Sequence, residues 1–333
     1  IMRNILCVTL IALLGGCTST SVTEKYQDKR NDIINVKDKV IEFETGNVLI
    51  GSVSRLYMSN KCLLIADHKS VDKQIHIFNK NDFSYLTSIG NFGEGPEEIT
   101  VMGCLAIDEA HHQLYVSDHA KQKIFSYDMD SVMVDSLYKP QVKTAMNETL
   151  FPSEYQYIND TLSIAVLIKP TSTSTFNQFL GRWNMNTGEM IPMKYTHPDI
   201  QKKRITFAAS EKAGIYVECY TRHDLMTICS LDGELLYNIY GPDWDGGNGN
   251  KLQSFGTVMI GNDKIFVSYC GEDYARDSFP TKILVFDLEG NYLKTLETGY
   301  KISDCCYDSF NNRIILSLND VVQFAYLDID GII

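Results

Sequence analysis

The 333-residue sequence predicts an all-β fold, a six-bladed β-propeller whose blades are four-stranded antiparallel sheets. The first observation behind this prediction is a short β-branched run that recurs six times, at intervals of 48 to 53 residues. The copies are residues 63–67, 114–118, 162–166, 215–219, 265–269 and 314–318. The second observation is that hairpin-type turns and alternating strands return at the same places around the copies. Four strands in a repeat of about 50 residues are typical of a propeller blade.

Each repeat supplies its strands in the same order. An apolar strand and a polar turn precede the recurring run, as in residues 104–112, and the run itself forms the second strand. A further turn leads into an alternating third strand such as Ile75–Phe78. A tight turn, for example residues 289–291, then leads into a fourth strand such as Tyr292–Leu296. Because consecutive strands joined by short turns pair in opposite directions, this order predicts an antiparallel blade.

The two ends of the repeat array complement each other. The sixth repeat stops at residues 321–326 without a fourth strand, and the alternating run Val40–Glu44 precedes the first repeat. Because an open sheet edge promotes aggregation, we expect this N-terminal strand to complete the last blade and close the ring. The sequence therefore predicts one propeller domain over residues 38–333, although length alone suggests two domains.

The N-terminus has the features of an export signal. Arg3 is followed by the apolar stretch Ile5–Leu14, which is too short to span a bilayer stably. The sequence Leu-Gly-Gly-Cys at residues 14–17 resembles a bacterial lipobox, in which the cysteine is diacylated. We therefore expect a signal peptide at residues 1–16, a lipid on Cys17 and a flexible polar tether at 17–37. An ordinary signal peptide with a chance cysteine is the alternative.

Composition excludes several classes of protein. A hydrophobic share of 44% excludes wholesale disorder, and the absence of any run of eighteen apolar residues excludes a multi-span membrane protein. A net charge of -12 argues against nucleic acid as a partner. The seven cysteines after residue 17 show no C-x-x-C spacing and no nearby paired histidines, which argues against a zinc site. We expect buried thiols, with one disulfide left open.

Two loops carry a resemblance to a known family. The segment Ser88–Glu98 resembles the G-x-x-G-x-G-P-x-E loop of the TolB-like six-bladed β-propeller lipoproteins of Bacteroidetes, and Tyr240–Trp244 resembles another loop of that family. Glu97 stands where the commoner loop has a glycine. The resemblance implies a lipoprotein of the cell envelope, in the outer membrane, with the periplasmic or surface side left open. It implies no catalytic residues.

Two loops hold candidate binding residues. The loop of residues 90–98 reads as a tight crossover between blades, and its acidic trio Glu94, Glu97 and Glu98 is a candidate contact for a cationic ligand or metal at the channel rim. Trp244 is a candidate aromatic platform for a sugar or peptide.

Oxygen ligands for calcium are clustered next to that tryptophan. Asp243, Asp245 and Asn248 are weak calcium candidates, because their loop lacks the closing glutamate of a helix-loop-helix site. A solvated loop is the preferred interpretation.

An Asp-His pair occurs at the same place in the first two blades, as Asp67-His68 and Asp118-His119. The functional interpretation is metal binding or proton transfer near the channel. The structural interpretation is that the aspartates cap the turn that follows the second strand. Repetition with the scaffold favours the structural interpretation.

The function that the sequence favours is a non-enzymatic binding or scaffolding lipoprotein that acts through the propeller face or channel. Its partners would be the membrane, through the lipid anchor, and a protein, peptide or glycan ligand. No cofactor is identified, and calcium is the named candidate ion. The alternative is a metal-dependent hydrolase or lyase of the lactonase-like propeller type. Three or more Asp, Asn, Glu or His side chains clustered at the axis would favour that alternative.

Overall fold

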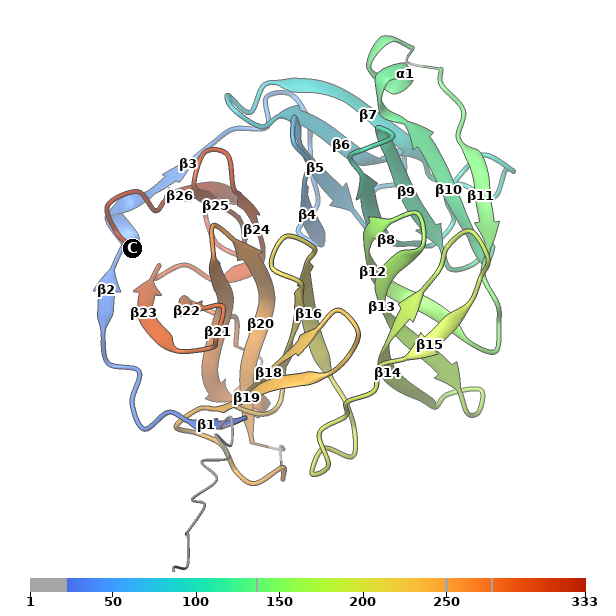
Figure 1. The fold of residues 1–333 in the computed structure, drawn as a ribbon. Helices are drawn as coiled ribbons and strands as arrows, with labels where there is room; N and C mark the ends of the chain where they lie inside the picture. The colour runs from blue at the N-terminus through green and yellow to red at the C-terminus, as the bar shows by residue number, and fades with distance from the viewer. Residues whose placement is uncertain (1–22, 136, 249–250, 277) are drawn as a thin grey trace, which may run out of the picture.

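The computed structural model describes residues 23–135, 137–248, 251–276 and 278–333 (Figure 1). The predicted signal peptide, Cys17 and the first residues of the predicted tether lie outside this part of the chain. Within it, six sheets follow one another around a ring, and each contains four antiparallel strands; two of the sheets also carry a fifth strand that pairs parallel at the outer edge. The predicted all-β, six-bladed propeller is therefore confirmed.

The first three blades each consist of four strands that are consecutive in the sequence. Blade 1 consists of β4 (Ser54–Met58), β5 (Cys62–Asp67), β6 (Lys73–Asn79) and β7 (Tyr85–Asn91). Blade 2 consists of β8 (Met102–Asp108), β9 (Gln113–Asp118), β10 (Lys123–Asp128) and β11 (Gln141–Ala145). Blade 3 consists of β12 (Phe151–Asn159), β13 (Leu162–Pro170), β14 (Phe176–Trp183) and β15 (Met190–Pro192).

The last three blades follow the same plan, with the fourth strand of blade 6 taken from the N-terminus. Blade 4 consists of β16 (Ile205–Ser210), β17 (Ile215–Tyr220), β18 (Leu225–Ser230) and β19 (Leu235–Tyr240). Blade 5 consists of β20 (Leu252–Gly261), β21 (Lys264–Asp273), β22 (Lys282–Asp287) and β23 (Tyr292–Glu297). Blade 6 consists of β24 (Ile302–Asp308), β25 (Arg313–Leu318), β26 (Phe324–Asp328) and β3 (Val40–Glu42).

Helical structure is sparse in the described residues. It comprises α1 (Met129–Val134) and the 3₁₀ turns η1 (Lys37–Lys39) and η2 (Tyr274–Arg276). The Asp128 carboxylate caps α1 by accepting a hydrogen bond from the Ser131 backbone N–H at 2.7 Å. No helix in this part of the chain is long and apolar enough to cross a membrane.

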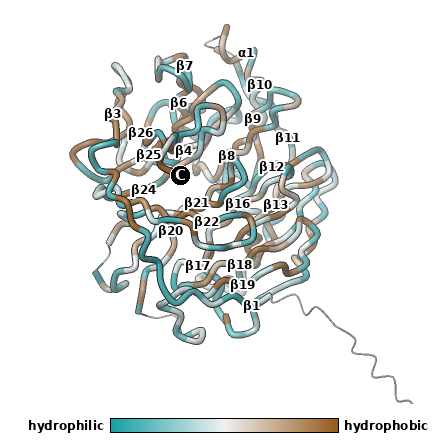
Figure 2. Tube along the Cα trace, turned by 60° about the vertical axis from the view of Figure 1, so that its left-hand side comes forward, coloured by the Kyte–Doolittle hydropathy of each residue, from teal (hydrophilic) through white to brown (hydrophobic). Residues whose placement is uncertain are grey.

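The core consists of six apolar clusters, one between each pair of neighbouring blades. The second strands β5, β17 and β25 are buried at every position, because neighbouring blades cover both of their faces. Figure 2 shows hydrophobic residues along the strands and hydrophilic residues in many connecting loops. The cluster that joins blades 6 and 1 contains Phe43, Leu56 and Ile315.

The ring closes as the sequence predicts. β3 pairs antiparallel with β26, with Val40 opposite Leu327 and Glu42 opposite Ala325. The backbone N–H of Phe43 extends the pairing by donating to the carbonyl of Phe324 at 3.1 Å. The first and last segments of the propeller thus share one blade. Pairing with β3 covers the edge of β26 that would otherwise be open.

The predicted tether is wrong for the part of it that the structure describes. β1 (Glu24–Tyr26) pairs parallel with β19 of blade 4, and β2 (Ile33–Asn35) pairs parallel with β23 of blade 5 (Figure 1). The outer strands of these two blades present unpaired backbone groups, and this polar segment satisfies them. We call residues 23–42 the strap, because they cross the outer edges of blades 4, 5 and 6 in succession.

All seven cysteines of the described residues are free and buried, which matches the expected buried thiols. They are Cys62, Cys104, Cys219, Cys229, Cys270, Cys305 and Cys306. Burial raises the pKa of the Cys104 thiol to about 12, so this thiol stays protonated at neutral pH.

The ring has an upper and a lower face. The upper face carries the loops between second and third strands and the crossovers from one blade to the next. The lower face carries the turns between first and second strands and between third and fourth strands.

Candidate functional site

Ionisable side chains from different blades meet at the upper mouth of the central channel. The first strand of each blade borders the channel, and the side chains of these strands alternate between the neighbouring blades and the axis. We define the channel-mouth cluster by its members, which are Arg55, His68, His119, Glu154 and Asp304. They come from blades 1, 2, 3 and 6.

An ion pair joins two blades that are not neighbours. Arg55 on β4 of blade 1 lies 2.8 Å from the Glu154 carboxylate on β12 of blade 3. The two side chains are 46% and 39% exposed, so solvent in the channel reaches both. Burial lowers the pKa of Arg55, but the charge and hydrogen bond of Glu154, together with Tyr57 and Asp304, outweigh burial and raise the pKa overall. The guanidinium is therefore a permanent cation at the mouth.

Asp304 is held in place by two hydrogen bonds from other blades. Its carboxylate accepts the backbone N–H of Leu56 in blade 1 at 2.8 Å and the Thr257 hydroxyl of blade 5 at 2.7 Å. Burial raises the pKa of Asp304, while the two hydrogen bonds and Arg55 oppose that change. This residue links three blades around the axis.

His68 and His119 complete the cluster from the loops above β5 and β9. The Nε2 atom of each ring is buried and has no hydrogen-bond partner in the structure. Burial lowers the pKa of both rings, and Arg55 lowers that of His68 further. Because the ordinary value is 6.5, both rings are neutral at pH 7, with one unpaired nitrogen each.

The aspartates beside these histidines are structural, as their repetition suggests. Asp67 accepts the backbone N–H groups of Lys69 at 2.9 Å and Gly51 at 2.7 Å. Asp118 accepts those of Thr100 at 2.8 Å and Ala120 at 3.0 Å. Each carboxylate therefore caps the turn after its strand and also holds the crossover that precedes the first strand of the same blade.

A cavity of 220 Å³ opens beside Glu154, between blades 3 and 4. We call it the blade 3–4 cavity. Its lining residues are Ser153, Glu154, Val166, Gln178, Arg204, Ile205 and Thr221. Glu154 thus belongs both to the wall of this cavity and to the ion pair at the channel mouth.

The predicted acidic trio of the crossover loop is not brought together as a site. Glu98 turns inward and accepts the Gly95 backbone N–H at 2.8 Å, Glu97 pairs with Lys139 at 2.8 Å, and Glu94 is exposed. The carbonyl groups of the loop hold a cation of the chain itself, because the Lys121 ammonium donates to the carbonyls of Gly95 and Glu98 at 2.6 and 2.5 Å. The loop is the tight crossover that the sequence suggests.

The substitution of the family's glycine by Glu97 causes no backbone conflict. The residues of this loop that have positive φ are Gly90 and Gly93, at 74° and 158°. Glu97 is not among the residues with positive φ, so an L side chain fits there.

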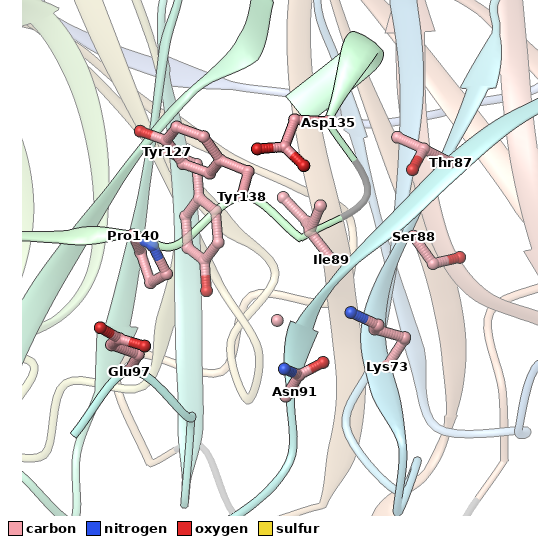
Figure 3. Close-up of a pocket in the computed structure, with 11 residues that line it drawn as sticks. Lys73, Thr87, Ser88, Ile89, Asn91, Glu97, Tyr127, Asp135, Tyr138 and Pro140 are labelled. Atoms are coloured by element: carbon pink, nitrogen blue, oxygen red, sulfur yellow. The ribbon is translucent and has the colours of Figure 1, made fainter. Parts of the chain in front are cut away.

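A small pocket lies between the outer strands of blades 1 and 2, where Glu97 faces Lys73 and Tyr138 (Figure 3). Its volume of 20 Å³ holds about one water molecule. This pocket is therefore too small for a ligand of even a few atoms.

Trp244 packs against blade 4 at the upper face. Its ring centroid lies 5.0 Å from that of Tyr240, 5.7 Å from that of His197 and 5.9 Å from that of His223. The indole is half-buried because it packs against these side chains, which leaves only part of its surface for contact with a ligand.

The three weak calcium candidates take separate partners. Asp243 accepts the Tyr269 hydroxyl at 3.4 Å, Asp245 lies 3.7 Å from His223, and the Asn248 amide donates to the Asp245 carbonyl at 3.0 Å. In the described part of the chain, one group of three side chains is arranged closely enough to hold a metal ion. It comprises Asp108, His111 and Asp160 in turns of the lower face, away from the channel mouth.

Sequence reasoning missed Arg55, Glu154 and Asp304. Each is an isolated charged residue in a first strand, and no local motif marks any of them. His68 and His119 carried a signal, the repeated Asp-His pair, but that repetition reflects the role of the aspartates. The two histidines belong to the candidate site because the propeller fold places both side chains at the same channel mouth.

Residues 18–177 match the model of the family DUF5128, described as a 6-bladed beta-propeller. No curated protein matches the sequence.

Several solved structures have a similar fold. A Bacteroides fragilis protein described as exported has a TM-score of 0.58 at 13% identity, covering 89% of this chain and 88% of that one. A member of the DUF4221 family from Bacteroides vulgatus has a TM-score of 0.57 at 10% identity, covering 90% and 98%. A luciferin-regenerating enzyme has a TM-score of 0.57 at 8% identity, covering 86% and 93%. At these identities the likeness concerns the fold alone, and the conclusion is that the chain is a six-bladed β-propeller.

Proposed function

We propose that this protein is a non-enzymatic binding lipoprotein of the bacterial cell envelope, of the TolB-like propeller type, and that it takes its ligand at the upper mouth of the channel. The observation that carries the proposal is the channel-mouth cluster beside the blade 3–4 cavity. Four blades contribute charged or unpaired polar groups to one opening, and a cavity adjoins it. Convergent polar groups at a concave opening are the usual features of a ligand site.

The chemistry of the cluster favours binding. Arg55 and Glu154 neutralise each other and stay accessible, so a ligand can replace either partner. The Nε2 atoms of His68 and His119 are buried without a partner beside this pair. A protein, peptide or glycan could present groups to this mouth.

The envelope location is supported by the lipobox-like sequence at Cys17 and by the likeness to a Bacteroides protein described as exported. Residues 18–23 separate Cys17 from β1, and seven residue steps reach at most about 25 Å. β1 runs parallel to β19, toward the upper face, so the chain reaches β1 from the lower side. On this proposal the lower edge of blade 4 lies near the bilayer and the channel mouth opens away from it.

The binding proposal is tested with the mature protein and a panel of probe compounds that contains amino acids, monosaccharides and dicarboxylates. We expect at least one class to raise the melting temperature of the wild type, and to lose that effect in Arg55→Gln and Glu154→Gln. The matched control is Arg182→Gln, which breaks the similarly exposed Arg182–Asp232 pair, 3.0 Å apart, on another surface. A panel without any binder, or equal binding by all variants, would overturn the proposal.

The lipid anchor is tested separately by expressing the full chain with Cys17→Ala in a bacterium. We expect the wild type to incorporate radiolabelled palmitate and to sediment with membranes, and the variant to do neither. A variant that stays membrane-bound would contradict the anchor.

The metal-dependent hydrolase or lyase is the competing function, and metal addition distinguishes it. On the binding proposal, calcium or zinc leaves the melting temperature of the purified protein unchanged. A metal-dependent rise that Asp304→Asn or Glu154→Gln abolishes would favour the enzyme.

A further inference from the structure

The blade 3–4 cavity has walls of opposite charge. The acidic residue Glu154 on β12 lines the cavity from blade 3, and the basic residue Arg204, which immediately precedes β16, lines it from blade 4. A cavity with one cation and one anion is complementary to a ligand that carries both charges. A ligand with a single charge would contact only one of these two residues by a charge-assisted hydrogen bond.

Arg204 is available for a ligand. In the part of the chain that the structure describes, its guanidinium forms no ion pair or hydrogen bond, and the residue is exposed. Its backbone is fixed, because the Arg204 carbonyl accepts the Thr221 N–H at 3.0 Å and the Thr221 hydroxyl at 3.3 Å. The planar fork of a guanidinium matches a carboxylate with two parallel hydrogen bonds.

Glu154 is shared between the cavity and Arg55, which lies 2.8 Å away. A carboxylate has about four lone-pair directions, so Glu154 can accept from an ammonium group while it keeps Arg55 as a partner. Arg55 therefore continues to orient the carboxylate when a cation enters the cavity.

The neutral part of the wall limits the size and polarity of the ligand. The Ser153 hydroxyl donates to the Val166 carbonyl at 3.2 Å, which leaves the hydroxyl oxygen free to accept. Val166 and Ile205 supply aliphatic surface. A volume of 220 Å³ lies below the roughly 300–1,000 Å³ typical of pockets for drug-sized ligands. The cavity thus suits a compact ligand with a short aliphatic side chain.

We propose that the blade 3–4 cavity binds a free aliphatic α-amino acid, with its carboxylate on Arg204 and its ammonium group on Glu154. This inference rests on the proposed function and names a ligand class for it. Gln178 lines the same cavity and adds an amide that can donate to the ligand carboxylate.

The test is isothermal titration of the mature protein with L-valine and two analogues that each lack one charge. Isobutylamine lacks the carboxylate, and 3-methylbutanoate lacks the ammonium group. We expect each analogue to bind about 10- to 100-fold more weakly than valine, because each lacks one of the two charge-assisted contacts. Analogues that bind as tightly as valine would overturn the inference.

Variants test which cavity residue contacts which charged group of the ligand. Arg204→Gln should weaken valine and 3-methylbutanoate without changing isobutylamine. Glu154→Gln should weaken valine and isobutylamine without changing 3-methylbutanoate. Arg204→Lys, which keeps the charge but loses the fork, should bind valine with intermediate affinity.

The matched control is Arg222→Gln. Arg222 is close to the cavity in the chain, but its guanidinium lies 3.9 Å from the ring centroid of Tyr274 and does not line the cavity. Its removal should leave valine binding unchanged. Unfolding midpoints equal to that of the wild type confirm that each variant is folded.

The outcomes separate this inference from the proposed function. If a different class of probe binds in a manner that depends on Arg55 and Glu154, the amino-acid inference is wrong and the binding function stands. If no probe binds at the mouth, both are wrong.

Discussion

The guanidinium of Arg30 in the strap lies 2.7 Å from the carboxylate of Asp224, in the upper loop between β17 and β18. The two side chains are 8% and 0% exposed, so this is a buried ion pair between segments 194 residues apart in the sequence. The same guanidinium lies 5.4 Å from the ring centroid of Tyr269 in blade 5. Arg30 thus joins the strap to both blades 4 and 5, and the strap is part of the folded ring.

Removal of Arg30 should destabilise the whole propeller. Arg30→Ala leaves the Asp224 carboxylate buried without its cation, and breaking a buried pair in this way costs about 3–5 kcal/mol. Urea unfolding at pH 7 measures the change. Arg276→Ala is the matched control, because the Arg276–Glu272 pair is 71% and 53% exposed and should contribute less than about 1 kcal/mol. Equal effects of the two substitutions would contradict this role for Arg30.

The strap should be protected from hydrogen exchange. The N–H groups of Gln27 and Val36 donate to the carbonyls of Tyr240 and Glu297 at 2.9 and 3.0 Å, and β1 and β2 add sheet pairing. We expect peptides that cover residues 24–35 to exchange more slowly than an unstructured chain, and Arg30→Ala to accelerate them. If this segment exchanges at the rate of an unstructured chain, it is a flexible tether and the strap is not paired with blades 4 and 5.

Acid should weaken the junction between blades 6 and 1. Asp308 lies 2.9 Å from the Lys80 ammonium, and both side chains are buried. Burial raises the pKa of Asp308, but Lys80 and Asn311 outweigh it, so the pKa lies below its ordinary value of 3.8. A carboxyl with a lowered folded pKa stabilises the fold above its unfolded pKa, and this contribution is lost as the pH falls through the folded pKa.

The measurement is the free energy of unfolding at pH 7 and pH 3 for the wild type and for Asp308→Asn. The difference between the two pH values should be smaller in the variant, which has no carboxyl to protonate at this position. The comparison is needed because burial raises the pKa of Asp224 and Asp304, so these two groups destabilise the fold as the pH rises. An unchanged pH dependence in Asp308→Asn would disprove the assignment to this pair.

Lys121 should control the order of the crossover loop between blades 1 and 2. Its ammonium donates to the carbonyls of Gly93, Gly95 and Glu98, and the Thr100 hydroxyl shares the Gly93 carbonyl at 2.7 Å. Lys121→Met removes these bonds, so limited proteolysis within residues 92–98 should become faster while the global unfolding midpoint changes little. Lys139→Met, which loses only the exposed contact with Glu97, is the control and should cleave like the wild type.

The sequence by itself determined the architecture. Six copies of a strand run, each with its own hairpin turns, specify six local antiparallel sheets, because strand alternation and turn chemistry act over a few residues. The missing fourth strand of the last repeat and the alternating run at Val40–Glu44 together determined how the ring closes.

The tertiary structure alone decided the strap and the candidate site. β1 and β2 have three residues each, too few for a periodic pattern, and they exist because β19 and β23 offer unpaired edges. Arg55, Glu154 and Asp304 are separated by 99 and 150 residues, and each is an ordinary charged residue in its own strand. They become neighbours because closure of the ring points the first strands of non-adjacent blades at one axis, a condition that no local stretch of sequence contains.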